Sequence, residues 1–422
     1  MLQTPQSGQT LLSYKKPIHP PSQTMTEPSK RVTILGGGFG GLYTALRLTQ
    51  FPWEKSQKPE ITLIDRRDRF LFSPLLYELV TGELESWEIA PPFEELLANT
   101  EIRFCQGVIS DIDINEKRVV LEDGRDFSSD RLVLAMGGET PLNIVEGATE
   151  NAIPFRELAD AYRLQERLRV LETSDKEKIR IAVVGGGYSG VELACKLADR
   201  LQERARIRIV ERADTILRTS PEFNRDAATK ALSARNIWTD LETDVSAIGP
   251  DTISLVYKEQ TDIIPVDLVL WTVGTKVAPV LEQISLPKNQ RGQISTNDKL
   301  QVVDYPDIFA LGDLSDCKDA DGQNIPPTAQ AAFQQADYAG WNIWASLTGR
   351  PLLPFRYQGL GEMMALGLDN ATLTGMGVQL DGQPAHLARR LIYLYRLPTL
   401  EHQLKVAFNW MSRPVRELLF NN

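Results

Sequence analysis

The stretch RVTILGGGFGGLYTALRL, residues 31–48, decides the fold of this 422-residue chain. An apolar run typical of a β-strand ends at Gly36, Gly38 and Gly41, which have the spacing G-x-G-x-x-G. The first glycine permits a tight turn, the second lets a pyrophosphate approach the backbone, and the third lets a helix pack on the strand. The phosphate would bind the free N–H groups at the start of that helix. The stretch therefore predicts a dinucleotide-binding unit.

A carboxylate follows where such a unit needs one. Residues 61–64 form a second β-type run that ends in Asp65, 24 residues beyond Gly41. A carboxylate at that position accepts hydrogen bonds from the hydroxyl groups of a ribose. The alternative is a glycine-rich turn that binds nothing, and the strand and acid that follow favour the nucleotide.

The chain repeats this pattern. Residues 179–194 read IRIAVVGGGYSGVELA, and a β-type run over 207–210 again ends in an acid. Two such loops predict two dinucleotides, for which a flavin and a nicotinamide are the natural redox pair. The residues that repeat the motif are Gly185, Gly187, Gly190 and Glu211.

The duplication extends beyond the glycine motifs. DRLVLAMG, which ends at Gly137, matches DLVLWTVG, which ends at Gly274. IFALGD, residues 308–313, and a helix-like segment over 328–347 follow the second copy. This order of elements predicts an α/β fold with two Rossmann-like, three-layer dinucleotide-binding domains. The predicted regions are an N-terminal extension (1–30), a first domain (31–150 and 297–349), a second domain (151–296) and a C-terminal region (350–422).

The first 30 residues differ in composition from the rest. They are rich in Pro, Ser, Thr and Gln and contain little that a core could bury. We therefore expect them to be disordered, and Met25 is an alternative translation start.

Charge and composition exclude several function classes. The formal net charge of −10 argues against nucleic acid as a partner. The sequence contains no run of 18 apolar residues, so we predict no membrane-spanning helix. The three cysteines are scattered, without the close pair that a dithiol reductase needs, and they fit a reducing compartment. Only three histidines are present and none is near a glycine motif, so we expect neither a His-rich metal site nor a Ser-His-Asp hydrolase. The chemistry must come from a cofactor.

Three further segments carry a resemblance to a known family. They are FSPLLYELVTG (72–82), PPTAQAAFQQADYAGWNI (326–343) and PFRYQGLGEMMALG (354–367). Together with the two glycine motifs and the late A-L-G-D, they resemble type II NAD(P)H:quinone oxidoreductases, within the flavoproteins that have two dinucleotide-binding domains. The resemblance covers residues 31–422 and is strongest to the cyanobacterial and plastid branch, whose best-known activity is demethylphylloquinone reduction in vitamin K1 synthesis.

The resemblance implies a role for each nucleotide motif. It places FAD on the first domain and NADH or NADPH on the second, with Asp313 accepting a hydrogen bond from the ribityl chain of FAD. The alternative for Asp313 is a turn aspartate that caps the next helix. The residues implied to bind FAD are Gly36, Gly38, Gly41, Asp65, Gly137 and Asp313. The residues implied to bind the nicotinamide nucleotide are Gly185, Gly187, Gly190, Glu211 and Gly274.

Nicotinamide preference follows from the second acid. The carboxylate of Glu211 would bind the 2′-OH of NADH and repel the 2′-phosphate of NADPH. Arg212 follows Glu211 directly and Arg218 is near it in sequence, so an arginine could still bind a 2′-phosphate. The cyanobacterial and plastid branch is associated with NADPH, which opposes the simple reading of Glu211. We predict that NADH is used at least as well and that NADPH is also accepted.

Three side chains are implied to act where the substrates react. Gln330 and Gln334 are four residues apart, on one face of a helix, and the resemblance places them beside the flavin where the quinone docks. The alternative is a helix surface with two solvated glutamines. Glu192 matches a family glutamate near the nicotinamide and the flavin, but an acid in the first turn of a helix also complements the helix dipole. Both interpretations of Glu192 remain open.

The C-terminal tail has the opposite charge to the whole protein. Residues 387–422 contain six Lys and Arg against two Glu, with apolar residues at helical spacing and breaks expected at Pro398 and Pro414. Basic amphipathic helices suit a membrane surface, where a lipid quinone must be collected. The alternative is that the apolar face packs on the core or on a second copy of the chain. The apolar residues are Leu387, Leu391, Tyr395, Leu400, Leu404, Phe408 and Met411.

The expected partners are a membrane quinone, a membrane surface reached by the tail, and a second copy in a homodimer. The expected location is peripheral, on the cytoplasmic side of a thylakoid or plasma membrane in a cyanobacterium-like cell. Sulfide:quinone and disulfide reduction need a close cysteine pair, which is missing. Reduction of a protein partner, or a non-enzymatic signalling role for an FAD-binding protein, remains open.

Overall fold

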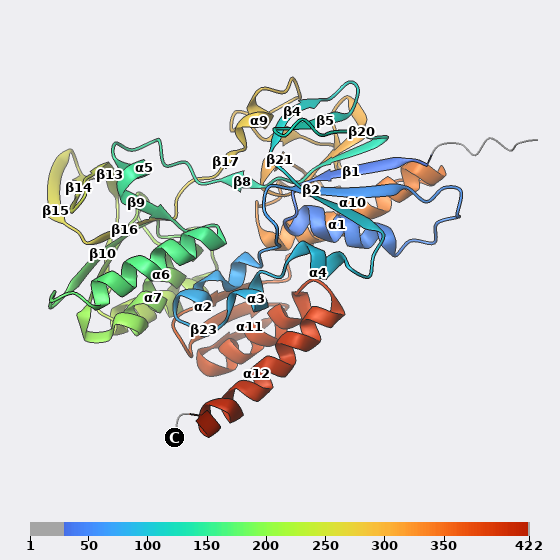
Figure 1. The fold of residues 1–422 in the computed structure, drawn as a ribbon. Helices are drawn as coiled ribbons and strands as arrows, with labels where there is room; N and C mark the ends of the chain where they lie inside the picture. Colours follow the sequence, from blue (N-terminus) through green and yellow to red (C-terminus); the bar gives the residue numbers. More distant parts are fainter. Residues whose placement is uncertain (1–28, 421–422) are drawn as a thin grey trace, which may run out of the picture.

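The structure is a computed structural model that describes residues 29–420, with side chains described through residue 413. The predicted disordered extension therefore lies almost entirely outside the described residues. Figure 1 shows two α/β domains side by side and the C-terminal helices at one edge of the molecule.

The first domain is built on a six-stranded sheet. Its strand order is β19-β20-β7-β1-β2-β3, and all neighbours are parallel except β19 and β20. Leu35 at the end of β1 pairs with Ile64 and with Leu134, so three strands end at one edge of the sheet. The strands are β1 (Arg31–Leu35), β2 (Glu60–Asp65), β3 (Ile102–Gln106), β7 (Arg131–Leu134), β19 (Gln301–Val302) and β20 (Tyr305–Ala310).

Helices and a second sheet complete the three layers of this domain. Helices α1 (Phe39–Thr49) and α10 (Ala329–Thr348) pack against each other on one side of the parallel sheet (Figure 1). The antiparallel sheet β4 (Ile109–Asp113), β5 (Arg118–Leu121) and β6 (Asp126–Ser128) belongs to the core cluster on the other side. Parallel strands covered on both faces are near-continuously apolar, which explains the run in β1.

The second domain repeats the plan. Its sheet has the order β12-β11-β10-β16-β9, all parallel, with an antiparallel sheet β13-β14-β15 beside it. Its helices are α6 (Leu158–Glu172), α7 (Tyr188–Leu201) and α8 (Glu222–Ala234). Its strands are β9 (Ala152–Pro154), β10 (Ile179–Val184), β11 (Ala205–Val210), β12 (Trp238–Asp240), β13 (Thr243–Ile248), β14 (Thr252–Tyr257), β15 (Gln260–Pro265) and β16 (Leu268–Trp271).

Two short strands carry the chain between the domains. β8 (Gly138–Glu139) leads into the second domain, and β17 (Lys276–Val277) returns antiparallel to it. The predicted end of the second domain at residue 296 is wrong, because residues after β17 already pack in the first domain. Leu281 and Ile294 belong to the buried cluster that contains Leu35 of β1.

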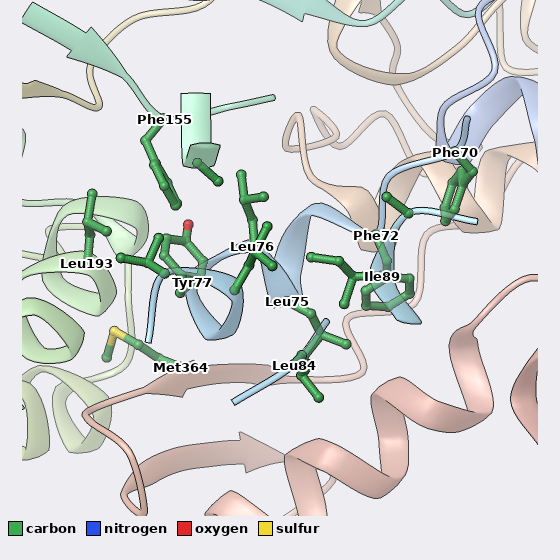
Figure 2. Close-up of a cluster of buried hydrophobic side chains, with 14 of the residues drawn as sticks. Phe70, Phe72, Leu75, Leu76, Tyr77, Leu84, Ile89, Phe155, Leu193 and Met364 are labelled. Carbon is green, nitrogen blue, oxygen red and sulfur yellow. The ribbon is translucent and has the colours of Figure 1, made fainter. Parts of the chain in front are cut away.

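The segment after β2 forms short helices. A 3₁₀ turn begins at Ser73, and Pro74 lies in its first turn. Proline is tolerated there because the N–H that it lacks would have no partner within the helix. The helices that follow are α2 (Leu76–Val80), α3 (Ser86–Ile89) and α4 (Phe93–Leu97). Figure 2 shows the core around α2, where side chains of both domains meet the C-terminal region. Its labelled members are Phe70, Phe72, Leu75, Leu76, Tyr77, Leu84, Ile89, Phe155, Leu193 and Met364.

The C-terminal region begins with a sheet that we did not predict. Strands β22 (Glu362–Ala365), β23 (Ala371–Gly375) and β24 (Val378–Asp381) form an antiparallel meander. The Thr372 hydroxyl donates to the Asn224 side chain of α8 at 2.6 Å, which fastens this sheet to the second domain. The remaining short elements are α5 (Ala148–Asn151), α9 (Pro279–Glu282), β18 (Ile294–Ser295) and β21 (Ser315–Asp316).

Two helices end the described chain, α11 (Gly382–Arg396) and α12 (Leu400–Phe420). Pro398 lies between them, as predicted. The break predicted at Pro414 is wrong, because α12 continues through that residue. A proline removes only one hydrogen bond from a helix. One turn earlier, Trp410 donates to the buried carboxylate of Glu88 at 2.8 Å, and this contact holds the helix in place.

The apolar row of the tail faces outward. All seven of its predicted members are 56–75% exposed, so packing of this face on the protein's own core is excluded. Polar residues of α12 point inward instead: His402 and Asn409 are buried, and Asn409 donates to Glu88 at 3.1 Å. Within the described residues, every helix is too short or too polar to cross a membrane.

Candidate active site

A cavity of about 1740 Å³ lies where the two domains and the C-terminal region meet. Drug-sized ligands occupy pockets of roughly 300–1,000 Å³, so this volume leaves room for more than one ligand. Its wall combines the first glycine loop, the residues after β7 and β16, the start of α7, the first turns of α10, and one face of α11.

The first glycine loop fits the ADP half of FAD. Gly36 has φ +96°, and a side chain on Gly41 would lie 1.8 Å from the Gly36 carbonyl oxygen, so both positions require glycine. Gly38 faces open space, and no side chain caps the start of α1, which leaves its N–H groups available to a phosphate. Gly137 also lines the cavity.

Asp65 lies against this loop. Its carboxylate is 4% exposed and accepts hydrogen bonds from the backbone N–H groups of Gly37 at 2.6 Å and Arg67 at 2.8 Å. The Arg67 guanidinium makes two longer contacts to the same carboxylate, at 3.2 and 3.4 Å. A carboxylate has about four acceptor sites, so a ribose hydroxyl would take the place of one of these longer contacts. The residues present on this wall therefore fit the group that the sequence implied.

Asp313 lies in a 3₁₀ turn (Gly312–Leu314) on the cavity wall. It does not cap the next helix, because the Thr328 side chain caps α10 by accepting from the Ala331 N–H, so the capping alternative is wrong. Burial raises the pKa of Asp313 above its usual value, and the ion pair with Arg156 opposes that rise. The sequence did not single out Arg156.

The second glycine motif repeats the first in geometry. Gly185 has φ +113°, and a side chain on Gly190 would lie 1.8 Å from the Gly185 carbonyl oxygen. Glu211 accepts from the Gly186 N–H at 2.6 Å, as Asp65 accepts from Gly37. Gly187 faces open space.

The position of the second motif differs from that of the first. Of the residues predicted to bind the nicotinamide nucleotide, only Gly274 lies on the cavity wall. Arg212, directly after Glu211, has a side chain that is 84% exposed and lies 3.6 Å from Asp244. The second nucleotide site is therefore open to solvent.

Glu192 reaches the cavity from α7. It is the fifth residue of that helix, not in the first turn, so the helix-dipole interpretation is wrong. Its carboxylate accepts from the Ala365 N–H at 2.7 Å and lies 3.5 Å from the Arg389 guanidinium. Burial raises the pKa of Glu192 to about 7, with Arg389 opposing the rise. It can therefore gain or lose a proton near neutral pH.

Glu192 belongs to a buried charge cluster that the sequence did not reveal. Arg389 of α11 forms an ion pair with Glu78 of α2, and Lys196 of α7 forms one with Glu83. The side chains of Arg389, Glu78 and Lys196 are fully buried. Burial raises the pKa of Glu78, but Arg389 and Lys196 outweigh it and bring the pKa below its usual value. The cluster joins three segments that are distant in sequence.

Gln330 and Gln334 both face the cavity from α10, but their amide groups are already engaged. Gln330 donates to the Gly361 carbonyl at 3.1 Å and accepts from the Tyr357 hydroxyl at 2.9 Å. Gln334 donates to the Gln358 carbonyl at 2.8 Å and accepts from its N–H at 3.0 Å. The solvated-surface alternative is therefore wrong: both glutamines hold the segment 357–361 as a wall of the cavity.

The cavity opens onto the exposed face of α11. Leu391 and Tyr395, which are 56% and 75% exposed, belong both to the outward apolar row and to the cavity lining. Arg396 lies beside them on the wall, with its guanidinium 4.6 Å from the centre of the Phe333 ring. Two side chains of the outward apolar row therefore also form part of the cavity wall.

Comparisons with known proteins identify the family of this chain. A sequence model of the pyridine nucleotide-disulphide oxidoreductase family matches residues 30–336. Demethylphylloquinone reductase NdbB of Synechocystis sp. is 57% identical over 401 residues, which cover 94% of this chain and 99% of that protein. The alternative NAD(P)H-ubiquinone oxidoreductase C1 of Arabidopsis thaliana is 43% identical, covering 91% and 80% of the two chains.

The fold agrees as well. The structure of NDH2 from Plasmodium falciparum in complex with NADH matches with a TM-score of 0.80 at 17% identity, covering 91% of this chain and 98% of that one. All three cysteines are free and buried, and burial raises the pKa of the Cys195 thiol to about 12, so they do not supply a reactive dithiol. The chain belongs to the pyridine nucleotide-disulphide oxidoreductase family and, within it, to the type II NAD(P)H:quinone oxidoreductases.

Proposed function

We propose that this protein catalyses the transfer of two electrons from NADH or NADPH to a quinone through bound FAD. When bound, FAD would supply the two-electron redox chemistry that links NAD(P)H to the quinone. The overall reaction converts NAD(P)H, one proton and a quinone into NAD(P)⁺ and a quinol. The observation that supports this best is the single cavity, in which the FAD-binding loop, Glu192 and the exposed face of α11 all meet.

The side chains of this protein would bind and orient the cofactor, exclude water and supply a proton. The glycine loop and Asp65 would hold the ADP half of FAD, and Asp313 its ribityl chain. Apolar side chains on the wall, such as Phe39 and Phe333, exclude water from the reacting rings. Glu192 holds a proton near neutral pH at the cavity wall, where a quinone that accepts electrons needs one.

The proposed quinone is demethylphylloquinone or a related naphthoquinone or plastoquinone, used in phylloquinone (vitamin K1) biosynthesis. The support is the relative with that named activity, which is 57% identical over 94% of this chain. The proposed location is peripheral, on the cytoplasmic side of a thylakoid or plasma membrane. A homodimer is also proposed. Its support is the exposed apolar row of the tail, part of which a second copy of the chain could cover.

Support for the membrane contact comes from the tail. Seven apolar side chains form one exposed row along α11 and α12, and the cavity opens beside two of them. Basic residues such as Arg390 and Lys405 lie on the same helices. Amphipathic helices of this kind bind in the plane of a bilayer surface.

Steady-state turnover tests the proposed reaction. The FAD-loaded protein is mixed with NADH or NADPH and a panel of short-chain naphthoquinones and benzoquinones. We expect quinone-dependent oxidation of the nicotinamide, fastest with a naphthoquinone. Flavin reduction without quinone turnover would favour the non-enzymatic alternative. Turnover only with a reducible protein would favour a protein partner.

Vesicle binding tests the membrane contact. Truncation before Leu387 is a poor test, because it removes Arg389 and leaves Glu78 buried without its ion pair. The triple variant Leu391→Glu, Leu404→Glu, Phe408→Glu changes exposed residues only. It should lose co-sedimentation with anionic vesicles and keep activity on a water-soluble quinone. Ile263→Glu, on the edge strand β15 and 69% exposed, is the matched control. Unchanged vesicle binding with a changed oligomeric state would assign the face to a dimer.

A further inference from the structure

Arg156 is a residue of the second domain that reaches into the flavin site of the first. It lies between β9 and α6, both of which belong to the second domain. Its backbone N–H donates to the Asp160 carboxylate at 3.0 Å, within the network that caps α6. The preceding Phe155 is buried, with its ring 5.3 Å from that of Tyr77. The backbone of Arg156 is therefore held firmly.

The side chain of Arg156 crosses the domain boundary. One guanidinium nitrogen forms an ion pair with Asp313 on the cavity wall. The other donates to the Thr275 hydroxyl at 3.2 Å, next to the crossover strand β17. Thr275 thus gives the guanidinium a second hydrogen-bond partner, and the contact with Asp313 depends on both domains keeping their relative position.

Arg156 also differs from Arg66 and Arg67, two other arginines on this wall. Arg66 is bound to Glu139 and Glu157, and Arg67 lies 3.2 Å from Asp65 and 3.9 Å from Glu157. These contacts involve the adenosine end of the site or the domain crossover. Arg156 contacts the carboxylate beside which the ribityl chain and the flavin ring would lie.

We propose that Arg156 is a positioning residue for FAD, which orients the Asp313 carboxylate and makes FAD affinity depend on the docking of the two domains. This inference rests on the proposed FAD-dependent function. Without Arg156, Asp313 would be a half-buried carboxylate with no cation to hold it in place, free to turn away from a ribityl hydroxyl or to take up a proton. A hydrogen bond to a charged group affects binding more than a neutral one does.

The test is FAD binding to apoprotein, followed by flavin fluorescence, with no turnover involved. Arg156→Gln should raise the Kd for FAD about 10- to 100-fold, and Arg156→Lys should restore part of the affinity because it keeps the cation. Asp313→Asn should raise the Kd by a similar factor. The double variant should bind no more than about twofold more weakly than Asp313→Asn alone, because both changes remove one coupled interaction.

Two controls separate this role from a general loss of structure. Arg169→Gln removes an exposed arginine of α6 that pairs only locally with Glu166, and should leave the Kd for FAD unchanged. The melting temperature of the Arg156→Gln apoprotein should match that of the wild type. An FAD Kd within twofold of wild type, or full additivity with Asp313→Asn, would overturn the inference. Failure of the wild-type protein to bind FAD would instead overturn the proposed function.

Discussion

The two glycine motifs have nearly the same local geometry and very different surroundings. In each, a carboxylate accepts a hydrogen bond from a backbone N–H of the loop at 2.6 Å. The third glycine is required in each, because a Cβ there would lie 1.8 Å from the carbonyl oxygen of the first. The first loop forms part of the cavity wall, roofed by α10 and the C-terminal region. The second loop lies outside that wall, and Arg212 beside its acid is almost fully exposed.

The difference supports the proposal that the two loops bind different kinds of ligand. An enclosed loop releases its ligand slowly, which suits a resident cofactor such as FAD. An open loop allows a nucleotide to enter and leave in every turnover, as a substrate must. The residues that set this difference are not in the motif, because the enclosure comes from segments that follow it at a distance in the sequence.

The largest expected effect comes from the glycines that both motifs share. Gly41→Ala places a methyl group against the Gly36 carbonyl, and Gly190→Ala does the same against Gly185. We expect the first variant to lose FAD or fail to fold. The second should stay yellow but reduce its flavin with NAD(P)H about 5- to 150-fold more slowly, since a misplaced backbone costs roughly 1–3 kcal/mol. Absorbance at the flavin band and stopped-flow reduction measure both.

A control for the glycine variants is Gly359→Ala, where a Cβ would meet nothing within 4 Å. It should behave as wild type. If Gly190→Ala lost FAD as readily as Gly41→Ala, the two loops would not serve separate ligands.

Asp65→Ala should weaken FAD binding by about 10- to 100-fold, because it removes a buried carboxylate acceptor. The affinity for NAD(P)H should stay within about twofold of wild type. Titration of apoprotein with each nucleotide gives both constants. Stoichiometric FAD with unchanged affinity would show that Asp65 does not bind the ribose.

Glu192 lies on the cavity wall, and its pKa near 7 predicts a pH dependence. Below pH 7 it is protonated, so the quinone half-reaction should fall about tenfold per pH unit above 7 if this proton is required. Glu192→Gln should remove the inflection and leave flavin reduction by NADH largely unchanged. An identical pH profile in the variant would assign the proton to another group.

The same pKa has a consequence for stability. Burial raises the pKa of Glu192 from 4.5 in the unfolded chain to about 7 in the folded protein. Between these values the native state binds more protons than the unfolded state, so this residue's contribution to stability decreases as pH rises through that window. Denaturant titrations at pH 5 and pH 8 should show a larger loss on raising the pH in wild type than in Glu192→Gln.

Gln330→Ala and Gln334→Ala should each raise the quinone KM about 3- to 10-fold, the loss of roughly one hydrogen bond. Rapid flavin reduction by NAD(P)H should stay near wild type. Tyr357→Phe tests whether Gln330 acts through the wall, because it removes the donor to that amide and leaves Gln330 in place. A raised KM in Tyr357→Phe supports a wall-holding role, whereas a normal KM supports direct binding of the quinone.

The smallest expected effect is on nicotinamide choice at the open loop. Glu211→Gln should shift the ratio of kcat/KM toward NADPH by about 2- to 5-fold, because it removes a charge that repels the 2′-phosphate and that water already screens. The wild type should use NADH at least as well as NADPH. A strong wild-type preference for NADPH would transfer the choice to Arg212.

Residues close together in sequence determined much of what could be predicted. The strand, glycine turn, helix and acid of each motif are local, and the structure places β1, α1 and β2 around Gly36 and Asp65 as expected. The α/β fold and the family follow from them. The outward apolar row of α11 and α12 was also readable, since helical spacing alone defines a face.

Only the tertiary structure decided what encloses the site. Helix α2, the sheet β22-β24 and the pairing of Arg389 with Glu78 were missed, because a charged residue in a sequence shows no sign of being buried. The pKa of Glu192 and the contact between Arg156 and Asp313 likewise depend on segments that meet only in the folded chain. Burial and long-range pairing are properties of packing in three dimensions, and they decide which of the two glycine loops is enclosed.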